Sequence, residues 1–500
     1  MPTGSTMPRR GRLCGLTCAS AVAASMLLAG CGTTVPVQGS AMPDAGVATP
    51  GGAVGTGLGG QPRATAATGG RGGASQTAQT TVGATEGPAS AAATETKTTV
   101  ATRRAAPYKV GLLYSSNAQA ALGALGARGD VGDWKAEGDA VVGYINAHGG
   151  MGGRRLVAEW YNADATQKSS DIGNAACVAW TQDDHVDGAV PGGSIVDMNS
   201  VRSCLAKTST PAISTEYHVQ TRQRGFAENR YWVEPFGIAM ESYAKTYVDG
   251  LAAQGFFNGA KLGVLYDDGA DWTTVERTVL ERELSRLHVG VAARASYELR
   301  DFSQVGSAEP AIDAAVLQFK SKGVNRVISF EPWVGWGFFM IAANQQKYLP
   351  TYGLSSQTAW TASYATGLVP DEEMTNAYYV GWSPVLDLKS PGPQWPRLRL
   401  CDAIYQAAGI QRNGALAEAI ALSTCDGLLD LAALGDAVGG ALTSSTFARA
   451  VADVSWQSAL VPRMSVSPAR PYGITLVRPA RWRTSCECFV YTGPAAAATR

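Results

Sequence analysis

From residue 108 onward, short apolar segments alternate with longer stretches in which apolar residues recur every three or four positions. Residues 108–114 have the composition of a buried strand, and residues 134–148 have the spacing of the helix that follows it. The alternation continues to residue 214, restarts at residue 261 and reaches a last clear strand at residues 351–354. Strands that alternate with helices form parallel sheets covered by helices on both faces. The sequence therefore predicts an α/β protein with two successive lobes.

The first thirty residues have the parts of a secretory signal peptide. Arginines between positions 9 and 12 precede an apolar stretch at residues 13–28, which is short for a membrane span. Leu-Ala-Gly then precedes Cys31 and matches the lipobox of bacterial lipoproteins, in which the cysteine receives a lipid and the chain is cut before it. We expect a signal peptide at residues 1–30, acyl chains such as palmitate on Cys31, and an extracytoplasmic protein anchored to the membrane. An ordinary signal peptide with a chance cysteine is the alternative, and the export route (general or twin-arginine) stays open.

The segment at residues 31–107 cannot build a hydrophobic core. Residues 32–106 are dominated by Gly, Ala and Thr and contain no Phe, Trp or Tyr. Such a chain buries too little apolar surface to offset the entropy of ordering it. We expect a disordered linker between the lipid and the globular part.

The composition and motifs exclude several classes of function. Lys and Arg (41) balance Asp and Glu (41), so we expect no nucleic-acid partner. The four histidines lie near no Cys-x-x-Cys pair, which disfavours a metal site. The chain has neither a Gly-x-Ser-x-Gly elbow nor a His-Glu-x-x-His helix, so we expect neither an enzyme nor a cofactor.

A set of short motifs, each weak alone, follows the order typical of one family. They are Lys-Val-Gly-Leu-Leu at 109–113, Ile-Asn-Ala-His-Gly-Gly-Met-Gly-Gly-Arg at 145–154, Asn-Ala-Asp at 162–164, Pro-Gly-Gly-Ser at 191–194 and Pro-Ala-Ile-Ser at 211–214. Together they resemble type I periplasmic binding proteins, above all the branched-chain amino acid binding proteins of ABC transporters. The resemblance covers about residues 108–382 and continues more faintly to the end.

The resemblance implies two Rossmann-like lobes with parallel sheets, joined by a hinge of three chain crossings. Lobe one is expected at residues 108–232 and 367–460, and lobe two at residues 233–366 and 461–500. Glu-Pro at position 234 and Val-Pro at position 369 mark the first two joints.

Candidate binding residues follow the predicted strands, where open α/β sheets hold their ligands. In lobe one they are Ser115, Ser116, Gly193, Ser194, Ser214 and Thr215; in lobe two they are Tyr266, Asp267, Glu331 and Trp333. Taken alone, each side chain could be an ordinary helix cap, turn residue or packing residue. The resemblance favours the binding role for Ser194, Ser214 and Thr215.

One position departs from the pattern of the amino acid binding members. There, an acidic residue after the strand equivalent to residues 351–354 commonly pairs with the ammonium group of the ligand. This chain has Ser-Ser-Gln at residues 355–357 instead. The resemblance then leaves Glu331 or Asp267 to take that role if the ligand is cationic at this end.

Six cysteines remain outside the signal peptide and the lipobox: Cys177, Cys204, Cys401, Cys425, Cys486 and Cys488. An even number in an exported chain indicates up to three disulfides. We expect Cys177 to pair with Cys204, because they lie on the helices either side of the third strand and the family often carries a bridge in this region. Cys401 with Cys425 is the second expected pair. The pairing of Cys486 with Cys488 stays open, because their spacing is short.

The resemblance implies a membrane-tethered solute-binding lipoprotein. Such a protein captures a small polar ligand, such as an amino acid or an amide, and delivers it to an ABC permease. Two alternatives stay open: a receptor of the same fold that reports its ligand to a sensor, and a cell-envelope protein whose cleft has degenerated.

Overall fold

The computed structural model describes residues 106–192, 195, 197–216, 220–299, 302–358, 367–392 and 394–499. These residues fall in one compact unit of the chain, residues 97–500. The signal peptide, Cys31 and nearly all of the predicted linker lie outside the described residues, as do Gly193 and Ser194. Among the described residues, no helix is both long and apolar enough to cross a membrane.

The first sheet of the described chain has five strands, all parallel, in the order β2-β1-β3-β4-β5. The strands are β1 (Tyr108–Tyr114), β2 (Leu156–Asn162), β3 (Gly188–Val190), β4 (Ala212–Ile213) and β5 (Trp232–Val233). The core strand β1 is buried along most of its length, as its apolar run predicts. Gly111 in this strand lies under the Trp180 ring, where an added Cβ would overlap the indole.

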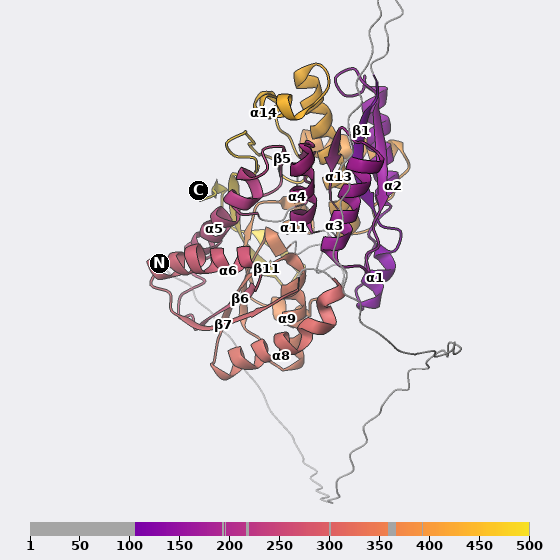
Figure 1. Ribbon diagram of the computed structural model, residues 1–500. Coiled ribbons are helices and arrows are strands. Elements are labelled where there is room, and N and C mark those ends of the chain that lie inside the picture. The colour runs from indigo at the N-terminus through magenta and orange to yellow at the C-terminus, as the bar shows by residue number, and fades with distance from the viewer. Residues whose placement is uncertain are drawn as a thin grey trace, which may run out of the picture. The chain divides into compact units, whose positions relative to one another are not determined.

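Helices from two distant parts of the chain cover this sheet. The early ones are α1 (Ala118–Ala124), α2 (Trp134–Ala147), α3 (Ser169–Val178) and α4 (Met198–Thr208); the late ones are α12 (Pro396–Ala407), α13 (Ala415–Val438) and α14 (Ser444–Asp453). The long α13 packs on α2, β3 and β4. Figure 1 shows α13 and α2 in the same part of the molecule. We call this sheet and its helices lobe one.

The Gly-Gly-Met-Gly-Gly turn between α2 and β2 explains one motif of the sequence. Its four glycines, at positions 149, 150, 152 and 153, all have positive φ, which side-chain-bearing residues rarely adopt. The turn places the fully buried Met151 against α13, where a Cβ at Gly435 would overlap its side chain. The motif therefore anchors the late helix to the first sheet.

The second sheet of the described chain has eight strands, with β12-β11-β10-β9-β8-β6-β7 as its main order and β13 paired to β11. The strands are β6 (Leu262–Asp267), β7 (Val291–Tyr297), β8 (Arg326–Phe330), β9 (Thr351–Ser355), β10 (Tyr378–Gly381), β11 (Leu476–Arg483), β12 (Cys488–Tyr491) and β13 (Ala496–Ala497). From β7 to β10 neighbouring strands are parallel, and β11 and β12 add an antiparallel edge. Antiparallel edge strands on a parallel sheet are common in α/β folds.

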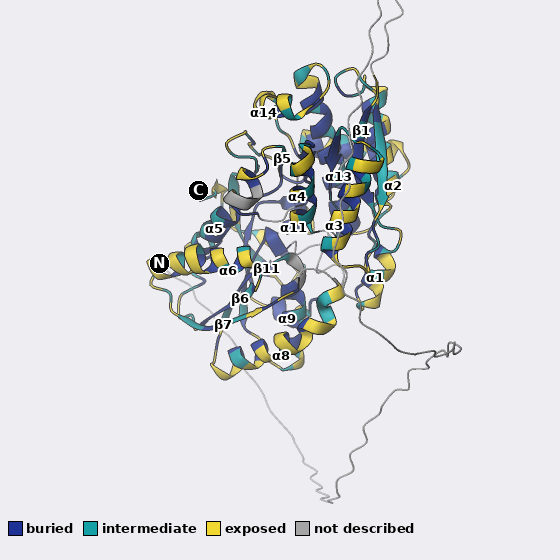
Figure 2. Ribbon diagram, in the orientation of Figure 1, coloured by how far each residue is buried: buried dark blue, intermediate teal, exposed yellow. Residues whose placement is uncertain are grey.

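Helices also cover the second sheet, and we call the two together lobe two. They are α5 (Met240–Ala253), α6 (Ala270–Val275), α7 (Glu281–Arg286), α8 (Val305–Ser321), α9 (Trp333–Gln345) and α11 (Pro384–Asp387). Short 3-10 or π-helical turns complete the helical elements: Ala179–Asp183, Arg222–Ala227, Glu276–Leu280, Phe302–Gln304, Ser356–Thr358 and Asp371–Met374. Figure 2 shows buried residues along the inner face of α9 and exposed ones along the outer face of α8.

The structure corrects one expected domain boundary. From the Val-Pro joint at position 369, we expected the chain to return to lobe one at residue 367. Instead, β10 pairs with β9 on one side and with β11 on the other, so the chain stays in lobe two through Gly381. Pro370 directly precedes the 3-10 turn Asp371–Met374, and the chain continues from that turn into β10 of the same lobe.

The three chain segments that join the lobes bond to one another. In the first segment, Glu234 N donates to Pro471 O of the third at 2.8 Å, and Ile474 N of the third donates to Gly237 O of the first at 3.2 Å. Ser383 Oγ of the second donates to Leu460 O of the third at 3.0 Å. The third segment therefore bonds to each of the other two.

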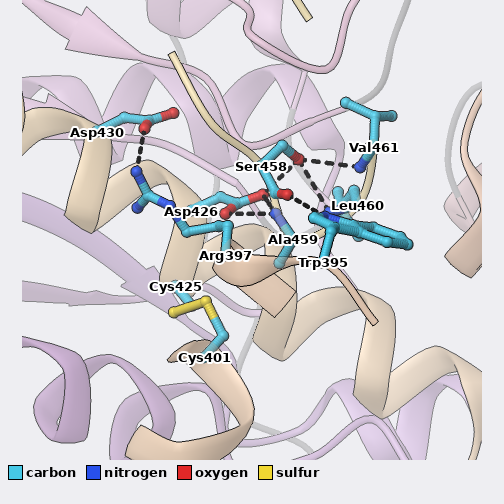
Figure 3. A network of polar contacts seen from close by, with 10 residues as sticks. All are labelled: Trp395, Arg397, Cys401, Cys425, Asp426, Asp430, Ser458, Ala459, Leu460 and Val461. Atoms are coloured by element: carbon cyan, nitrogen blue, oxygen red, sulfur yellow. Dashed lines mark hydrogen bonds and ion pairs between the residues drawn. A yellow bond between two sulfur atoms is a disulfide. The ribbon is translucent and has the colours of Figure 1, made fainter. Parts of the chain in front are cut away.

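A buried polar network ties the third segment to lobe one (Figure 3). Asp426 on α13 accepts Ser458 Oγ at 2.7 Å and Ala459 N at 2.8 Å. Ser458 Oγ in turn accepts Leu460 N at 2.9 Å. One turn further along α13, Asp430 pairs with Arg397 of α12 at 3.1 Å.

The structure contains the two disulfides expected from the sequence and the one left open. Cys177–Cys204 joins α3 to α4, and Cys401–Cys425 joins α12 to α13. Cys486 and Cys488 bond to each other just before and at the start of β12.

Candidate ligand-binding site

Ligands of open α/β folds bind beyond the carboxyl ends of the parallel strands. In lobe one, β1 ends next to Ser115 and Ser116. Ser115 Oγ donates to Asn117 Oδ1 at 3.0 Å, and Ser116 N donates to Asn162 Oδ1 at 3.1 Å. Ser116 is exposed, and Ser115 is partly so. Ser116 Oγ also accepts Asn162 Nδ2 at 3.1 Å, so this loop bonds to the last residue of β2. The Ser116 hydroxyl can still donate at this rim, whereas the Ser115 hydroxyl already donates to Asn117.

Ser214 and Thr215 follow β4 but are buried inside lobe one. Thr215 Oγ1 donates to Pro191 O at 3.2 Å, and an added Cβ on either Gly192 or Gly427 would overlap the Thr215 side chain. Ser214 Oγ accepts the Glu216 amide at 3.3 Å. In this structure Thr215 holds the loops after β3 and β4 together, whereas Ser214 bonds within its own loop.

Glu331 directly follows β8 in lobe two and is 2% exposed. Its Oε1 accepts Ser329 Oγ at 2.8 Å, and its Oε2 lies where a Cβ of Gly335 would be. Burial raises the pKa of Glu331 to about 8, with a further contribution from the nearby Asp267 carboxylate. The side chain is therefore mostly protonated at neutral pH and lacks the charge that an ammonium group would need.

The other lobe-two candidates differ in their surroundings. Asp267 ends β6, is 1% exposed and accepts the Gly269 amide at 2.8 Å just before α6. Tyr266 is partly exposed and packs against the core. Trp333 begins α9, and its side chain lies outside the described residues.

The segment after β9 holds a residue that the sequence analysis noted only as a departure. Gln357 lies in the 3-10 turn Ser356–Thr358 and is 1% exposed. Among the described residues, neither Oε1 nor Nε2 of its amide has a hydrogen-bond partner. Buried amides are almost always bonded, so this exception needs an explanation. The glutamine itself was the signal available in the sequence.

A second missed group lies beside the first joining segment. Arg202 of α4 is 4% exposed and donates to Gln220 Oε1 and Asn199 Oδ1, both at 2.6 Å. Burial lowers the pKa of Arg202, while the negative charges of Glu234 and of Asp271 in α6 of lobe two act to raise it. Arg202 therefore places a cation of lobe one near acidic groups of the hinge and of lobe two.

Glu234 itself is fully buried. Its Oε1 accepts Trp232 Nε1 at 2.9 Å, and its Oε2 has no hydrogen-bond partner. Burial raises the pKa of Glu234 to about 8, against the opposing effect of Arg202. Sequence alone marked this position only as the residue before a proline.

The fold is similar to the folds of several solved binding proteins. No family model and no curated protein matches the chain in sequence. Among solved structures, it is similar to a solute-binding protein of an ABC transporter from Rhodopseudomonas palustris BisB5, in complex with 3,4-dihydroxybenzoic acid (TM-score 0.56, 14% identity, 79% of this chain and 98% of that one). It is also similar to a branched-chain amino acid transporter binding protein from Streptococcus pneumoniae, in complex with isoleucine (TM-score 0.52, 13% identity, 79% and 100%). A possible leucine/isoleucine/valine-binding protein from Rhodopirellula baltica SH 1 is a third (TM-score 0.56, 14%, 78% and 97%).

These similarities confirm the predicted fold class. The chain has the two-lobed α/β fold of type I periplasmic solute-binding proteins of ABC transporters, including the branched-chain amino acid binding proteins. The described structure agrees, with two sheets joined by three segments.

Proposed function

We propose that the protein is an extracytoplasmic solute-binding lipoprotein that captures a small carboxylate ligand between its two lobes for an ABC importer. The observation that carries the proposal is the fold, whose solved neighbours are binding proteins of such transporters. Two of those neighbours hold ligands that share a carboxylate, 3,4-dihydroxybenzoic acid and isoleucine.

Lobe one is the proposed carboxylate side. The loop after β3 carries Gly193 and Ser194 and leads into α4. The first amides of α4 are capped by Asp197, whose carboxylate accepts Asn199 N and Ser200 N, both at 3.2 Å. The donors proposed for the ligand are therefore those of Gly193 and Ser194, which precede the cap. Ser116 adds a hydroxyl donor at the same edge of the sheet, since its oxygen accepts from Asn162 and its hydrogen can still be donated. Neutral donors suit a ligand that must be released, because a buried ion pair is costly to separate.

Lobe two is proposed to close on the opposite end of the ligand. Tyr266 and Asp267 end β6, Glu331 follows β8, and Trp333 begins α9. The three joining segments supply the hinge about which such a closure would take place. The lipid on Cys31 and the linker would keep the protein at the membrane that holds the permease.

A thermal-shift screen of the full chain tests the proposal. The library contains hydroxybenzoates, branched-chain amino acids, amides and polyols. We expect at least one carboxylic acid to raise Tm, because a ligand that binds only the folded state stabilises it. Ser194→Ala should reduce that shift, whereas Ser285→Ala, an exposed serine of α7, should leave it unchanged.

Two results would count against the proposal. A library in which no carboxylic acid raises Tm would contradict the proposed ligand class. Equal effects of Ser194→Ala and Ser285→Ala would remove Ser194 from the site.

A further inference from the structure

The amide of Gln357 stands out among the buried polar groups of lobe two. Gln357 follows β9 directly, at the carboxyl end of the second sheet, where the proposed site lies. Its side chain is 1% exposed, and both its donor and its acceptor lack a partner. Leaving a buried polar group unpaired is unfavourable, so a partner that bonded to both atoms would be strongly favoured.

The neighbours of Gln357 are already committed to other bonds. Ser355 Oγ bonds with the Tyr243 hydroxyl at 3.1 Å and accepts the Gln357 backbone amide at 3.3 Å. Ser356 Oγ donates to Asp387 Oδ1 at 2.6 Å, and Thr358 Oγ1 donates to Ser355 O at 2.5 Å. These bonds fix the backbone of the turn around Gln357 and leave its amide as the group with unused bonding capacity.

The turn is also fixed from outside. The Trp336 indole of α9 donates to Thr358 O at 3.2 Å, and the Trp382 amide of the second joining segment donates to Ser356 Oγ at 2.7 Å. These hydrogen bonds hold the backbone of the turn in place, so the Gln357 side chain starts from a fixed position. A residue that determines ligand specificity needs such a fixed position.

The chemistry of a primary amide selects its partner. Gln357 offers two N–H donors and one carbonyl acceptor, so its complement is a group that both donates and accepts. A hydroxyl or an amide does both. An ammonium group only donates, and would leave Nε2 unpaired; a carboxylate only accepts, and would leave Oε1 unpaired.

The nearby acidic groups do not offset this preference. Glu331 is held by Ser329 and buried, and burial raises its pKa. Asp267 accepts the Gly269 amide before α6. Lobe two therefore presents an uncharged donor–acceptor group just after the end of β9.

We propose that Gln357 is the specificity-determining residue of lobe two, and that it binds an uncharged hydroxyl or amide group of a ligand whose carboxylate faces lobe one. The inference rests on the proposed function. It narrows the ligand to hydroxy acids and acid amides and disfavours α-amino acids and other ligands with an ammonium group at that end.

Isothermal titration calorimetry of the full chain with two matched probe series tests the inference. One series is 4-hydroxybenzoate, benzoate and 4-(aminomethyl)benzoate; the other is 2-hydroxy-4-methylpentanoate, 4-methylpentanoate and leucine. In the series that binds, we expect the hydroxy acid to bind about tenfold or more tightly than its deoxy analogue, since the analogue leaves the amide unpaired. The ammonium member should bind more weakly than the hydroxy acid.

Variants assign the preference to this residue. Gln357→Leu should reduce the hydroxy-to-deoxy ratio to about threefold or less. Gln357→Glu keeps the size of the side chain and should shift the preference toward the ammonium member. Gln406→Leu, at an exposed position of α12, should keep the wild-type ratios. Circular dichroism and Tm identify any variant that fails to fold. The order in which the wild type prefers the probe ligands tests the inference even without the variants.

The outcomes separate the two claims. If no carboxylate of either series binds the wild type, the proposed function fails and the inference fails with it. If carboxylates bind but the ammonium member binds as tightly as the hydroxy acid, the proposed function stands and the inference is wrong. The inference is also wrong if folded Gln357→Leu weakens the hydroxy and deoxy members equally.

Discussion

Several acidic side chains of this protein lie where water does not reach, and their protonation links stability to pH. Glu234, Glu331 and Glu137 each have a pKa raised to about 8, and burial is the largest cause in every case. In the unfolded chain the same groups titrate near 4.5. Between these values the folded state binds more protons than the unfolded state. The stabilisation is full below about pH 4.5 and is lost as the pH rises through about 8.

Glu234→Gln should weaken this pH dependence, because glutamine resembles the protonated carboxyl and cannot ionise. A single such group changes the free energy of unfolding by up to about 1.4 kcal/mol per pH unit within its window. Denaturant unfolding at pH 5, 6.5 and 8 measures the slope. Glu228→Gln, at an exposed position six residues earlier in the chain, is the matched control and should keep the wild-type slope. If Glu234→Gln had the same slope as the wild type, Glu234 would not contribute to the pH dependence of the free energy of unfolding.

The sequence predicts which residues lie near the site, but it does not predict the surroundings of each side chain. The positions after strands could be named from the strand pattern alone. Whether Thr215 points outward or inward depends on Gly192 and on Gly427, which lies far along the chain. The unpaired state of Gln357 likewise depends on neighbours from α5, α9 and α11. No local pattern carries that information.

At the scale of elements, α13 connects lobe one to the hinge. It packs on α2 and the first sheet, and through Asp426 it holds the third joining segment at residues 458–460. The disulfide Cys401–Cys425 joins α12 to α13 at the residue just before Asp426. A helix that is fixed on both sides in this way gives the hinge a rigid base.

Asp426→Ala should loosen the third segment, because it leaves the Ala459 amide and the Ser458 hydroxyl without their acceptor. Each buried donor left unpaired costs about 1–3 kcal/mol. We expect a lower free energy of unfolding and faster hydrogen exchange at residues 459–461. Asp453→Ala, an exposed residue at the end of α14, is the control. Unchanged exchange in Asp426→Ala would mean that the network does not hold this segment.

Elements were predicted well where their periodicity was strong, and poorly where one residue was taken as a boundary. The alternation of apolar strands and amphipathic helices identified both sheets, because strand and helix periods differ clearly. β10 was assigned to the wrong lobe, since the proline at position 370 was taken as a crossing. The apolar run Ala-Tyr-Tyr-Val-Gly-Trp at residues 377–382 was the strand signal that should have outweighed it. The antiparallel β11–β12 edge had no counterpart in the strand–helix pattern.

At the scale of the whole molecule, we predict that the N-terminus tethers the protein to the membrane. Replacing Cys31 with serine removes the thiol that we predict to receive the lipid, so the variant should leave the membrane fraction and become soluble outside the cytoplasm. Fractionation with immunoblotting measures this, and metabolic labelling with a fatty acid should mark the wild type alone. A Cys31→Ser variant that stays fully in the membrane fraction would contradict lipid anchoring.

The central claim is that the two lobes hold one small carboxylate molecule. Native mass spectrometry of the full chain, purified from cells without refolding and then incubated with the carboxylic acids of the screen, tests it most directly. The account predicts one small-molecule adduct per chain, which denaturation releases and which is identified as a carboxylic acid. A chain that keeps its bare mass through purification and through saturating incubation with every acid of the screen would contradict it.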